Sequence, residues 1–262
     1  MSPLVASIAG IGFWTRGLPS WAAACDYARG GTVADDAPAR PSPQLLAPNE
    51  RRRAPETVAV ALDVALAACH AAGRDPATLP SVFASTHGDL AITDYMCATL
   101  AHEPRALSPT RFHNSVHNAA AGYWTIGTGA LQPATALSAH HASFAQGLLD
   151  ALAQLACGED AVLLVGYDSQ AVGPLAQMAP STGLLGGALV LTRAQPGTIQ
   201  LSARLGAAAP ATDAAIGPLQ RFAAGNAMAP MLPLFDALAT GRDRVALPTG
   251  AGRVLQMEVV HA

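Results

Sequence analysis

Histidines carry most of the reactive chemistry in this sequence. His113, His117, His140 and His141 lie close together along the chain, and an imidazole can bind a metal or move a proton. His113 and His117 stand at i and i+4, a spacing that suits two metal ligands on one helix. No carboxylate or cysteine completes a set around them, so the sequence predicts no metal site.

A hydrolase triad is a second chemistry that the residue types permit. Ser138, His140 and Asp168 are a serine, a histidine and an aspartate in sequence order. The chain has no G-x-S-x-G elbow to present a serine nucleophile, and neighbouring residues of a strand face opposite ways. We therefore expect no triad.

Two shorter motifs have ordinary structural explanations. His87-Gly88-Asp89 follows a predicted strand, where α/β folds often place function, but a turn in which Asp89 caps the next helix is favoured. Arg51-Arg52-Arg53 could meet an acidic acyl carrier protein. A solvated helix start is slightly favoured there.

A longer pattern resembles a known enzyme family. It comprises Asn118-Ala119-Ala120-Ala121-Gly122, then Pro133, then Ser138-Ala139-His140-His141-Ala142-Ser143. This resembles the core of the β-ketoacyl synthases of the thiolase-like superfamily, which read Asn-Ala-Ala-Ala-Gly, Gly-Pro and Thr-Ala-Cys-x-Ser. The spacing from the asparagine to the proline and the spacing from the proline to the nucleophile position both fit the family without a gap.

The resemblance implies that the catalytic machinery is missing. His141 occupies the position of the cysteine nucleophile, His140 that of the preceding alanine and Ser143 that of the following serine. The family's two histidine motifs of the second half are also absent. Condensation needs a thiolate and oxyanion donors, so no catalytic residue and no cofactor are expected.

The resemblance also implies a partner. Cysteine-lacking relatives act as chain-length factors, and shortened ones occur with aryl polyene and related pigment or fatty-acid gene sets. We expect a heterodimer with an active β-ketoacyl synthase across strand 134–138, in which loop 111–115 reaches the partner's acyl tunnel. The expected interface residues are Arg111, Phe112, His113, His117, Asn118, Ala134, Thr135, Ala136, Leu137 and Ser138.

Two alternatives remain open. The chain could be an independent, divergent acyltransferase or hydrolase that uses His140 or His141, although no convincing nucleophile accompanies them. It could instead be a homodimeric protein that binds acyl chains. Light scattering of the chain, alone and with a synthase, would separate this last possibility from the partner-subunit hypothesis.

The elements that must position these residues alternate in type. Strand, helix, strand is the pattern of an α/β domain with a mostly parallel sheet. Strands are expected at 5–13, 81–85, 134–138, 161–166, 187–193 and 198–205, with a closing hairpin of 244–247 and 253–260. Helices are expected at 50–72, 90–102, 118–126, 144–157 and, broken by Pro230 or Pro233, 218–238. Residues 108–112 are expected to open as a turn.

The resemblance implies a layered αβαβα fold with two unequal halves. Residues 1–195 correspond to a complete N-terminal half of a β-ketoacyl synthase. Residues 196–262 correspond to a reduced second half, packed on the first, in which a first strand, a helix and the final hairpin remain.

Composition agrees with a subunit of an assembly. Hydrophobic residues make up 51% and charged residues 13% of the 262 residues, so apolar surface should be covered by a partner. The net charge of −3 and the lack of a basic stripe exclude a nucleic-acid binder. No C-x-x-C pair, signal peptide or membrane-spanning run is seen, and the cytoplasm is the expected location.

Overall fold

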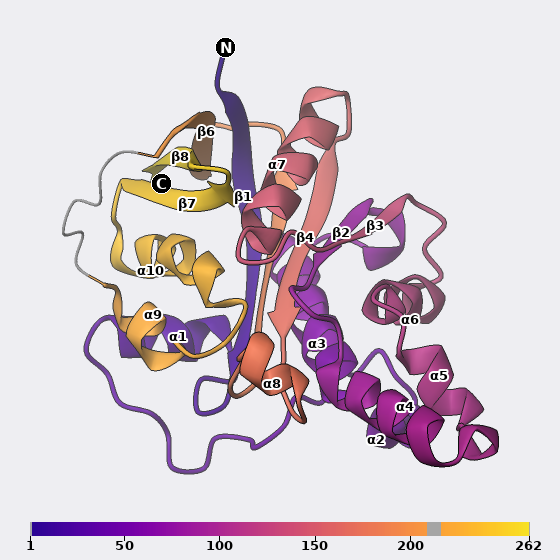
Figure 1. Ribbon diagram of the computed structural model, residues 1–262. Helices are drawn as coiled ribbons and strands as arrows, with labels where there is room; N and C mark the ends of the chain where they lie inside the picture. Colours follow the sequence, from indigo (N-terminus) through magenta and orange to yellow (C-terminus); the bar gives the residue numbers. More distant parts are fainter. Residues whose placement is uncertain (1, 209–215, 262) are drawn as a thin grey trace.

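The computed structural model describes residues 2–208 and 216–261 (Figure 1). Its strands form one eight-stranded sheet in the order β3-β2-β4-β5-β1-β6-β8-β7. The strands are β1 (Leu4–Thr15), β2 (Ser81–Ala84), β3 (Ala134–Leu137), β4 (Ala161–Asp168), β5 (Leu185–Thr192), β6 (Ile199–Ala207), β7 (Arg244–Gly250) and β8 (Arg253–Val260).

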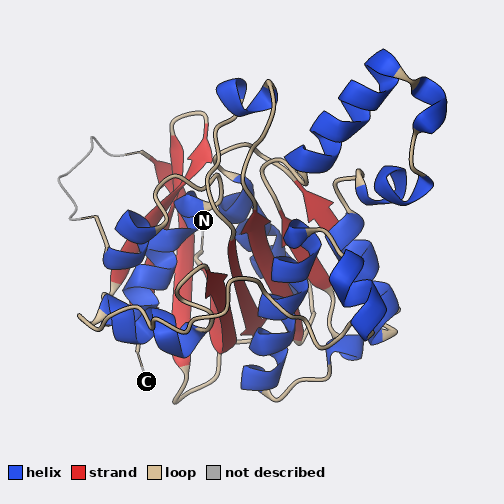
Figure 2. Ribbon diagram, turned by 90° about the horizontal axis from the view of Figure 1, so that it is seen from below, coloured by secondary structure: helices blue, strands red, loops and turns tan. Residues whose placement is uncertain are grey.

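Helices lie on both sides of this sheet (Figure 2). They are α1 (Trp21–Ala28), α2 (Pro48–Arg53), α3 (Glu56–Ala72), α4 (Leu90–His102), α5 (Pro109–Asn114), α6 (Ala119–Thr128), α7 (Ser143–Ala156), α8 (Leu175–Met178), α9 (Pro218–Phe222) and α10 (Leu232–Thr240). Short 3-10 turns, η1 (Pro76–Thr78), η2 (Pro104–Ala106) and η3 (Ala229–Met231), connect some of them.

Most strand pairs are antiparallel, which corrects the expectation of a mostly parallel sheet. Only the pairs of β2 with β3 and β4 are parallel. The other five pairs, β4–β5, β5–β1, β1–β6, β6–β8 and β8–β7, are antiparallel. Only β7 and β8 are neighbours through a tight turn; β1 pairs with β5 and β6, which lie far away in the sequence, so the sequence gives no local signal for these antiparallel pairs.

Two hydrophobic clusters separate the layers. One cluster lies between the sheet and the helices α3 and α6, and includes Phe83, Trp124 and Val165. The other lies on the opposite face around α7 and α10, and contains inward side chains of β6, β7 and β8 such as Leu201 and Leu255. Helices α7 and α10 therefore lie between two parts of a bent sheet, as in a thiolase-like layered fold.

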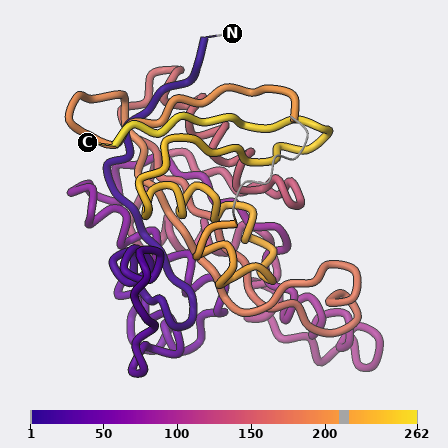
Figure 3. Tube along the Cα trace, turned by 90° about the vertical axis from the view of Figure 1, so that its left-hand side faces the viewer, coloured from indigo at the N-terminus to yellow at the C-terminus, as the bar shows by residue number. Residues whose placement is uncertain are grey.

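The strand β1 joins the two parts. Its first residues pair with β6 from Leu4↔Ala203 to Ile8↔Ile199, whereas its later residues pair with β5. Figure 3 shows β6, in orange, running beside the β7–β8 hairpin, in yellow. On the other face, β1 lies close to α3, because a Cβ at Gly10 would lie 2.1 Å from the Ala68 carbonyl oxygen.

Two expectations about helices need correction, whereas the expected break within 218–238 is observed. Residues 50–72 do not form one helix: α2 ends at Arg53, and α3 starts after Pro55, because the residue before a proline avoids the helical region. Residues 109–114 are helical, since the Ser108 hydroxyl caps α5 and Pro109 suits its first turn. Prolines 218, 230 and 233 lie in the first turns of α9, η3 and α10 rather than in helix interiors.

Candidate functional site

The candidate site lies where the parallel strands β2, β3 and β4 end. Their carboxyl ends lie at the same edge of the sheet, which is where α/β folds place ligands. The loop after β2 carries His87, the turn after β3 carries His140 and His141, and Asp168 is the last residue of β4. Helix α7 starts at the same place, so its N-terminal positive dipole faces the site.

A tight turn places the two adjacent histidines before α7. The Ser143 hydroxyl accepts a hydrogen bond from the Ala139 N–H at 2.9 Å and donates to the His140 carbonyl at 2.7 Å. His140 has a φ of 55°, which only a minority of non-glycine residues adopt. The His140 and His141 rings are exposed and nearly perpendicular, with centroids 4.0 Å apart. The Ser143 hydroxyl therefore stabilises this turn through both hydrogen bonds.

Asp168 is a fully buried carboxylate below the turn. It accepts hydrogen bonds from the Ser85 hydroxyl at 2.7 Å, the Thr86 N–H at 3.0 Å and the His87 N–H at 3.2 Å. Burial raises the pKa of the Asp168 carboxyl, although these hydrogen bonds oppose the shift. Through these hydrogen bonds, Asp168 fixes the conformation of the loop after β2.

His87 joins the two exposed histidines at this site. Burial lowers the pKa of His87, Asp168 raises it, and the nearby His140 and His141 imidazoles lower it further. The net direction is down, which favours a neutral ring. The expected turn is confirmed in part, since Asp89 caps α4 and accepts from the Ile92 N–H at 3.0 Å. The proximity of His87 to residues 140 and 141 has no local sequence signal.

Neither the triad nor the metal pair is assembled. The Ser138 hydroxyl donates to the Thr86 carbonyl at 2.9 Å, and the Asp168 oxygens face Ser85, Thr86 and His87. His113, on α5, packs its ring at 6.1 Å from that of Tyr123, while the His117 Nε2 lies 2.9 Å from the Ser85 carbonyl. Across residues 2–208 and 216–261, no group of three or more metal-binding side chains is gathered.

No cysteine lies at the site. Cys25 is on α1, Cys69 on α3, Cys97 on α4, and Cys157 follows the far end of α7 from His141. All four are free thiols. Burial raises the pKa of Cys69 to about 12, which makes it a poor nucleophile. A thiolate at the start of α7 is thus not available from this chain.

An open strand edge and exposed apolar side chains lie beside the site. β3 ends the sheet, and its neighbour α6 carries Ile126, which is 80% exposed, while Leu131 in the following loop is 97% exposed. A groove of about 460 Å³ between α6 and β3 is lined by His117, Asn118, Ala121, Gly122, Thr125, Ala134 and Ala136. Exposed apolar surface at a free edge is a feature of protein interfaces.

The backbone of β3 presents alternate residues to solvent. The N–H groups of Ser81, at the start of β2, and of Ser85, which follows β2, donate to the carbonyls of Pro133 and Leu137 respectively. A strand residue directs its N–H and C=O to the same side, so Pro133, Thr135 and Leu137 face β2. The backbone groups of Ala134 and Ala136 therefore face outward and are free for a further strand.

Helices α4 and α5 form an arm that projects from the body (Figure 1). Only Leu90 of α4 is buried, although the helix is largely apolar. The guanidinium of Arg111 lies 3.8 Å from the centroid of the Tyr95 ring and links the two helices. Phe112 is 62% exposed on α5, so this arm offers apolar side chains to another molecule.

Sequence comparison assigns the family. A profile of the β-ketoacyl synthase N-terminal domain matches residues 21–251. The chain belongs to the β-ketoacyl synthase family. A search of curated proteins gave no match. No helix in the described part of this β-ketoacyl synthase relative is both long and apolar enough to cross a membrane.

Solved ketosynthase complexes share the fold of this family member. One is the ketosynthase (ApeO) in complex with its chain length factor (ApeC) from Xenorhabdus doucetiae, with a TM-score of 0.76 at 20% identity, covering 97% of this chain and 99% of the other. The ishigamide ketosynthase/chain length factor gives 0.73 at 15%, with 99% of each chain covered. The AntDE:AntF complex of a ketosynthase with its acyl-carrier protein gives 0.72 at 11%, with full coverage of both chains.

These findings confirm the resemblance to β-ketoacyl synthases and the thiolase-like α/β fold. The structure brings together His140, His141 and Ser143, and places Asn118, His117 and the β3 residues beside one groove. His113 and His117 do not share a helix, although their i, i+4 spacing would suit one, since His113 is on α5 and His117 precedes α6.

Proposed function

We propose that this chain is a non-catalytic partner subunit of an active β-ketoacyl-[acyl carrier protein] synthase and shapes its acyl tunnel as a chain length factor does. One observation carries the proposal: the start of α7, beside an open strand edge, presents two histidines and no thiol. The similarity to ketosynthase complexes supports it. The elongation products would be β-ketoacyl chains of a polyene or unusual fatty-acid type.

The partner would bind at β3. Ala134 and Ala136 offer free backbone groups, and Ile126 and Leu131 offer apolar area. The opposite edge of the sheet is protected: β7 carries Arg244 and Pro248, and charge and proline both discourage strand addition. The arm with Arg111, Phe112 and His113 would then extend over the partner and reach its tunnel.

The strand order supports an origin from the two-half synthase fold. Outward from β1 the sheet continues with β5 and then β4, and outward from β6 it continues with β8 and then β7. In both halves these two outer strands form an antiparallel pair. We take 1–195 as the complete half and 196–262 as the half that lacks its middle. Four free thiols suit a reducing compartment, and the cytoplasm is our proposed location.

Association and elongation test this role together. The chain should form a one-to-one complex with its synthase in light scattering, and the complex should elongate a carrier-bound acyl group that the chain alone leaves unchanged. A homodimer that ignores the synthase would instead support an acyl-binding protein.

Mass spectrometry tests the lack of catalysis. No acyl adduct should form on the chain after incubation with acyl carrier protein. His141→Cys should not restore condensation, because the only histidine after residue 196 is His261, which bonds the Arg242 carbonyl and lies away from the site. Maleimide labelling of the new thiol would verify that it is accessible. Turnover by wild type would favour the independent acyltransferase or hydrolase.

A further inference from the structure

Helix α5, which carries Phe112, is joined to the rest of the chain by few side chains. It projects with α4 from the body (Figure 1), and Asn114 alone of its six residues is buried. A segment with so little buried surface keeps its orientation only through the individual contacts of its side chains. The direction of Phe112 therefore depends on what holds α5.

Two tyrosines from neighbouring helices hold α5. On the α4 side, the guanidinium of Arg111 lies 3.8 Å from the centroid of the Tyr95 ring. On the α6 side, the Tyr123 hydroxyl donates to the Asn114 Oδ1 at 3.0 Å, and the Tyr123 ring lies edge-on to that of His113 with centroids 6.1 Å apart. Helix α5 thus lies between two aromatic side chains that belong to different helices.

Both tyrosines stand on helices that are fixed to the body. Helix α6 buries Trp124 in the core between the sheet and α3. The start of α4 is fixed by Asp89, which caps the helix and accepts a hydrogen bond from the Thr57 hydroxyl of α3 at 2.8 Å. Each tyrosine can therefore hold α5 in place relative to the body.

These contacts fix the rotation of α5 about its axis. Successive helix residues are about 100° apart around the axis, so Arg111 and His113 flank Phe112 on either side. Phe112 and Asn114 are about 160° apart, nearly opposite one another. Because Asn114 is buried and bonded to Tyr123, Phe112 is directed away from the body, in agreement with its exposure.

We infer that Tyr95 and Tyr123 are positioning residues that act through Phe112: by holding α5 in one rotation, they determine how sharply the complex limits the length of its acyl products. The inference rests on the proposed function, in which the arm that carries Phe112 reaches the partner's tunnel. Neither tyrosine needs to touch the acyl chain. Without their contacts α5 can turn, and the Phe112 ring leaves its place in part of the molecules.

Replacing Tyr95 tests the α4 side. Tyr95→Leu keeps an apolar side chain but removes the aromatic face that holds the guanidinium, whereas Tyr95→Phe keeps that face. In the complex, Tyr95→Leu should raise the share of products longer than the wild-type length by roughly two- to fivefold, the change in population that an exposed cation–π contact supports. Tyr95→Phe should leave the share unchanged. Mass spectrometry of the released chains measures it.

Hydrogen exchange tests the same contacts in the chain alone. The amides of 109–114 should exchange faster in Tyr95→Leu by a similar factor, while those of α3 and α7 keep their rates. Tyr123→Phe removes only the hydroxyl that bonds Asn114, and should act on α5 in the same direction. The melting temperature of the Tyr95 variants should not change, because α4 and α5 lie outside both hydrophobic clusters.

A double variant distinguishes positioning from a general loss of structure. If Tyr95 acts only through Phe112, its loss has no further effect once the ring of Phe112 is gone. Tyr95→Leu with Phe112→Ala should therefore give the same product lengths as Phe112→Ala alone. Effects that add would show that the two residues act independently, and would overturn the inference.

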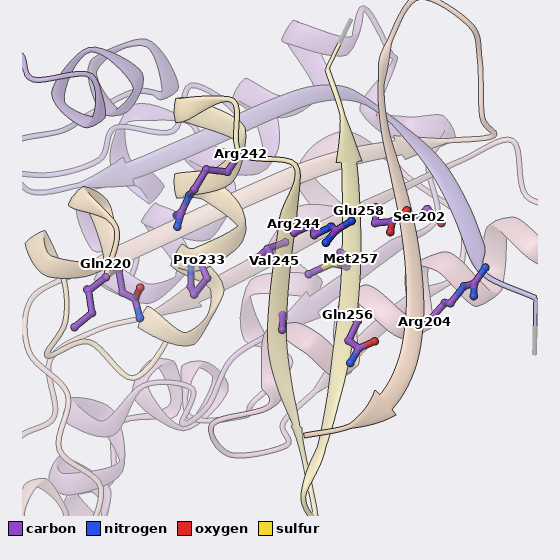
Figure 4. Close-up of a pocket in the computed structure, with 12 residues that line it drawn as sticks. Ser202, Arg204, Gln220, Pro233, Arg242, Arg244, Val245, Gln256, Met257 and Glu258 are labelled. Atoms are coloured by element: carbon purple, nitrogen blue, oxygen red, sulfur yellow. The ribbon is translucent and has the colours of Figure 1, made fainter. Parts of the chain in front are cut away.

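Arg111→Ala and Arg244→Ala form a matched pair of arginine losses. Arg111→Ala removes the cation from Tyr95 and should lengthen products as Tyr95→Leu does. Arg244 is also exposed, but it lies on β7 at the end of the sheet opposite β3, beside Glu258 rather than an aromatic ring (Figure 4). Arg244→Ala should leave product length unchanged. The same change in both variants, or a change in neither, would contradict the positioning role.

The same products separate this inference from the proposed function. Normal length in Tyr95→Leu, together with longer chains in Phe112→Ala, would refute the positioning role alone. Unchanged length in Phe112→Ala, in a complex that still elongates, would refute the contact of the arm with the tunnel and the positioning role with it.

Discussion

Phe112 is the residue through which this chain would most directly control product length. It lies on α5 with 62% of its surface exposed, so it is not part of the core. A buried phenylalanine would cost roughly 3–5 kcal/mol on truncation, whereas an exposed one changes stability by less than about 0.5 kcal/mol. Its ring is therefore available to fill space in a partner.

Phe112→Ala should leave the melting temperature of the subunit nearly unchanged and lengthen the products of the complex. Each additional methylene accommodated contributes about 0.8 kcal/mol, so a few carbons shift the product distribution strongly. Chromatography and mass spectrometry of the released chains, with calorimetry of the same variant, check both outcomes. Unchanged product length would remove Phe112 from the tunnel.

His87 makes stability depend on pH. Its pKa is lowered on folding, mainly by burial, so the unfolded chain takes up a proton first as the pH falls. The contribution is fully present above the ordinary histidine pKa of about 6.5 and is lost as the pH falls from there toward the lowered folded value.

Thermal unfolding between pH 7.5 and 5.5 should show this loss in the wild type and a shallower dependence in His87→Gln. Asp168, His140 and His141 surround the ring and remain in both proteins. A variant as sensitive to acid as the wild type would assign the dependence to other groups.

At the scale of an element, β3 is the strand at which we propose that a partner binds. Its backbone alternates, so that Ala136 faces outward and Thr135 faces β2. The two adjacent positions therefore give a matched pair of proline substitutions, since proline removes one backbone donor in each case.

Ala136→Pro should weaken association with the synthase at least about tenfold and change the melting temperature little, because proline is tolerated on an edge. Thr135→Pro should lower the melting temperature instead, since it removes a hydrogen bond within the sheet. Light scattering and calorimetry of both variants separate these effects. Full affinity in Ala136→Pro would place the interface away from β3.

At the scale of the whole molecule, the two segments 1–195 and 196–262 share one core. The cluster around α7 contains Phe144 and Leu148 from the first segment, and Phe235, Leu247 and Met257 from the second. β1 also pairs with β6 across the boundary. Neither segment can bury this cluster without the other.

Unfolding should accordingly be one cooperative transition, with coincident curves by circular dichroism and fluorescence. A chain truncated after residue 195 should be unfolded or aggregated, because it exposes the apolar face of β1 and α7. Two separate transitions, or a stable truncated chain, would show that the segments fold independently.

The sequence by itself determined the elements and the family. Strands 134–138 and 161–166, the helix after His141 and the closing hairpin followed from apolar pattern and turn residues, and each lies where it was expected. The motif from Asn118 to Ser143 was local enough to indicate β-ketoacyl synthase ancestry and the absence of the thiol. These features depend on residues close together in the chain.

Only the tertiary structure decided what depends on distant segments. The antiparallel pairing of β1 with both β5 and β6 and the approach of His87 to His140 and His141 join residues far apart in sequence. The alternation of β3 likewise needed the register with β2, because a shift of one residue exchanges the two sides of a strand.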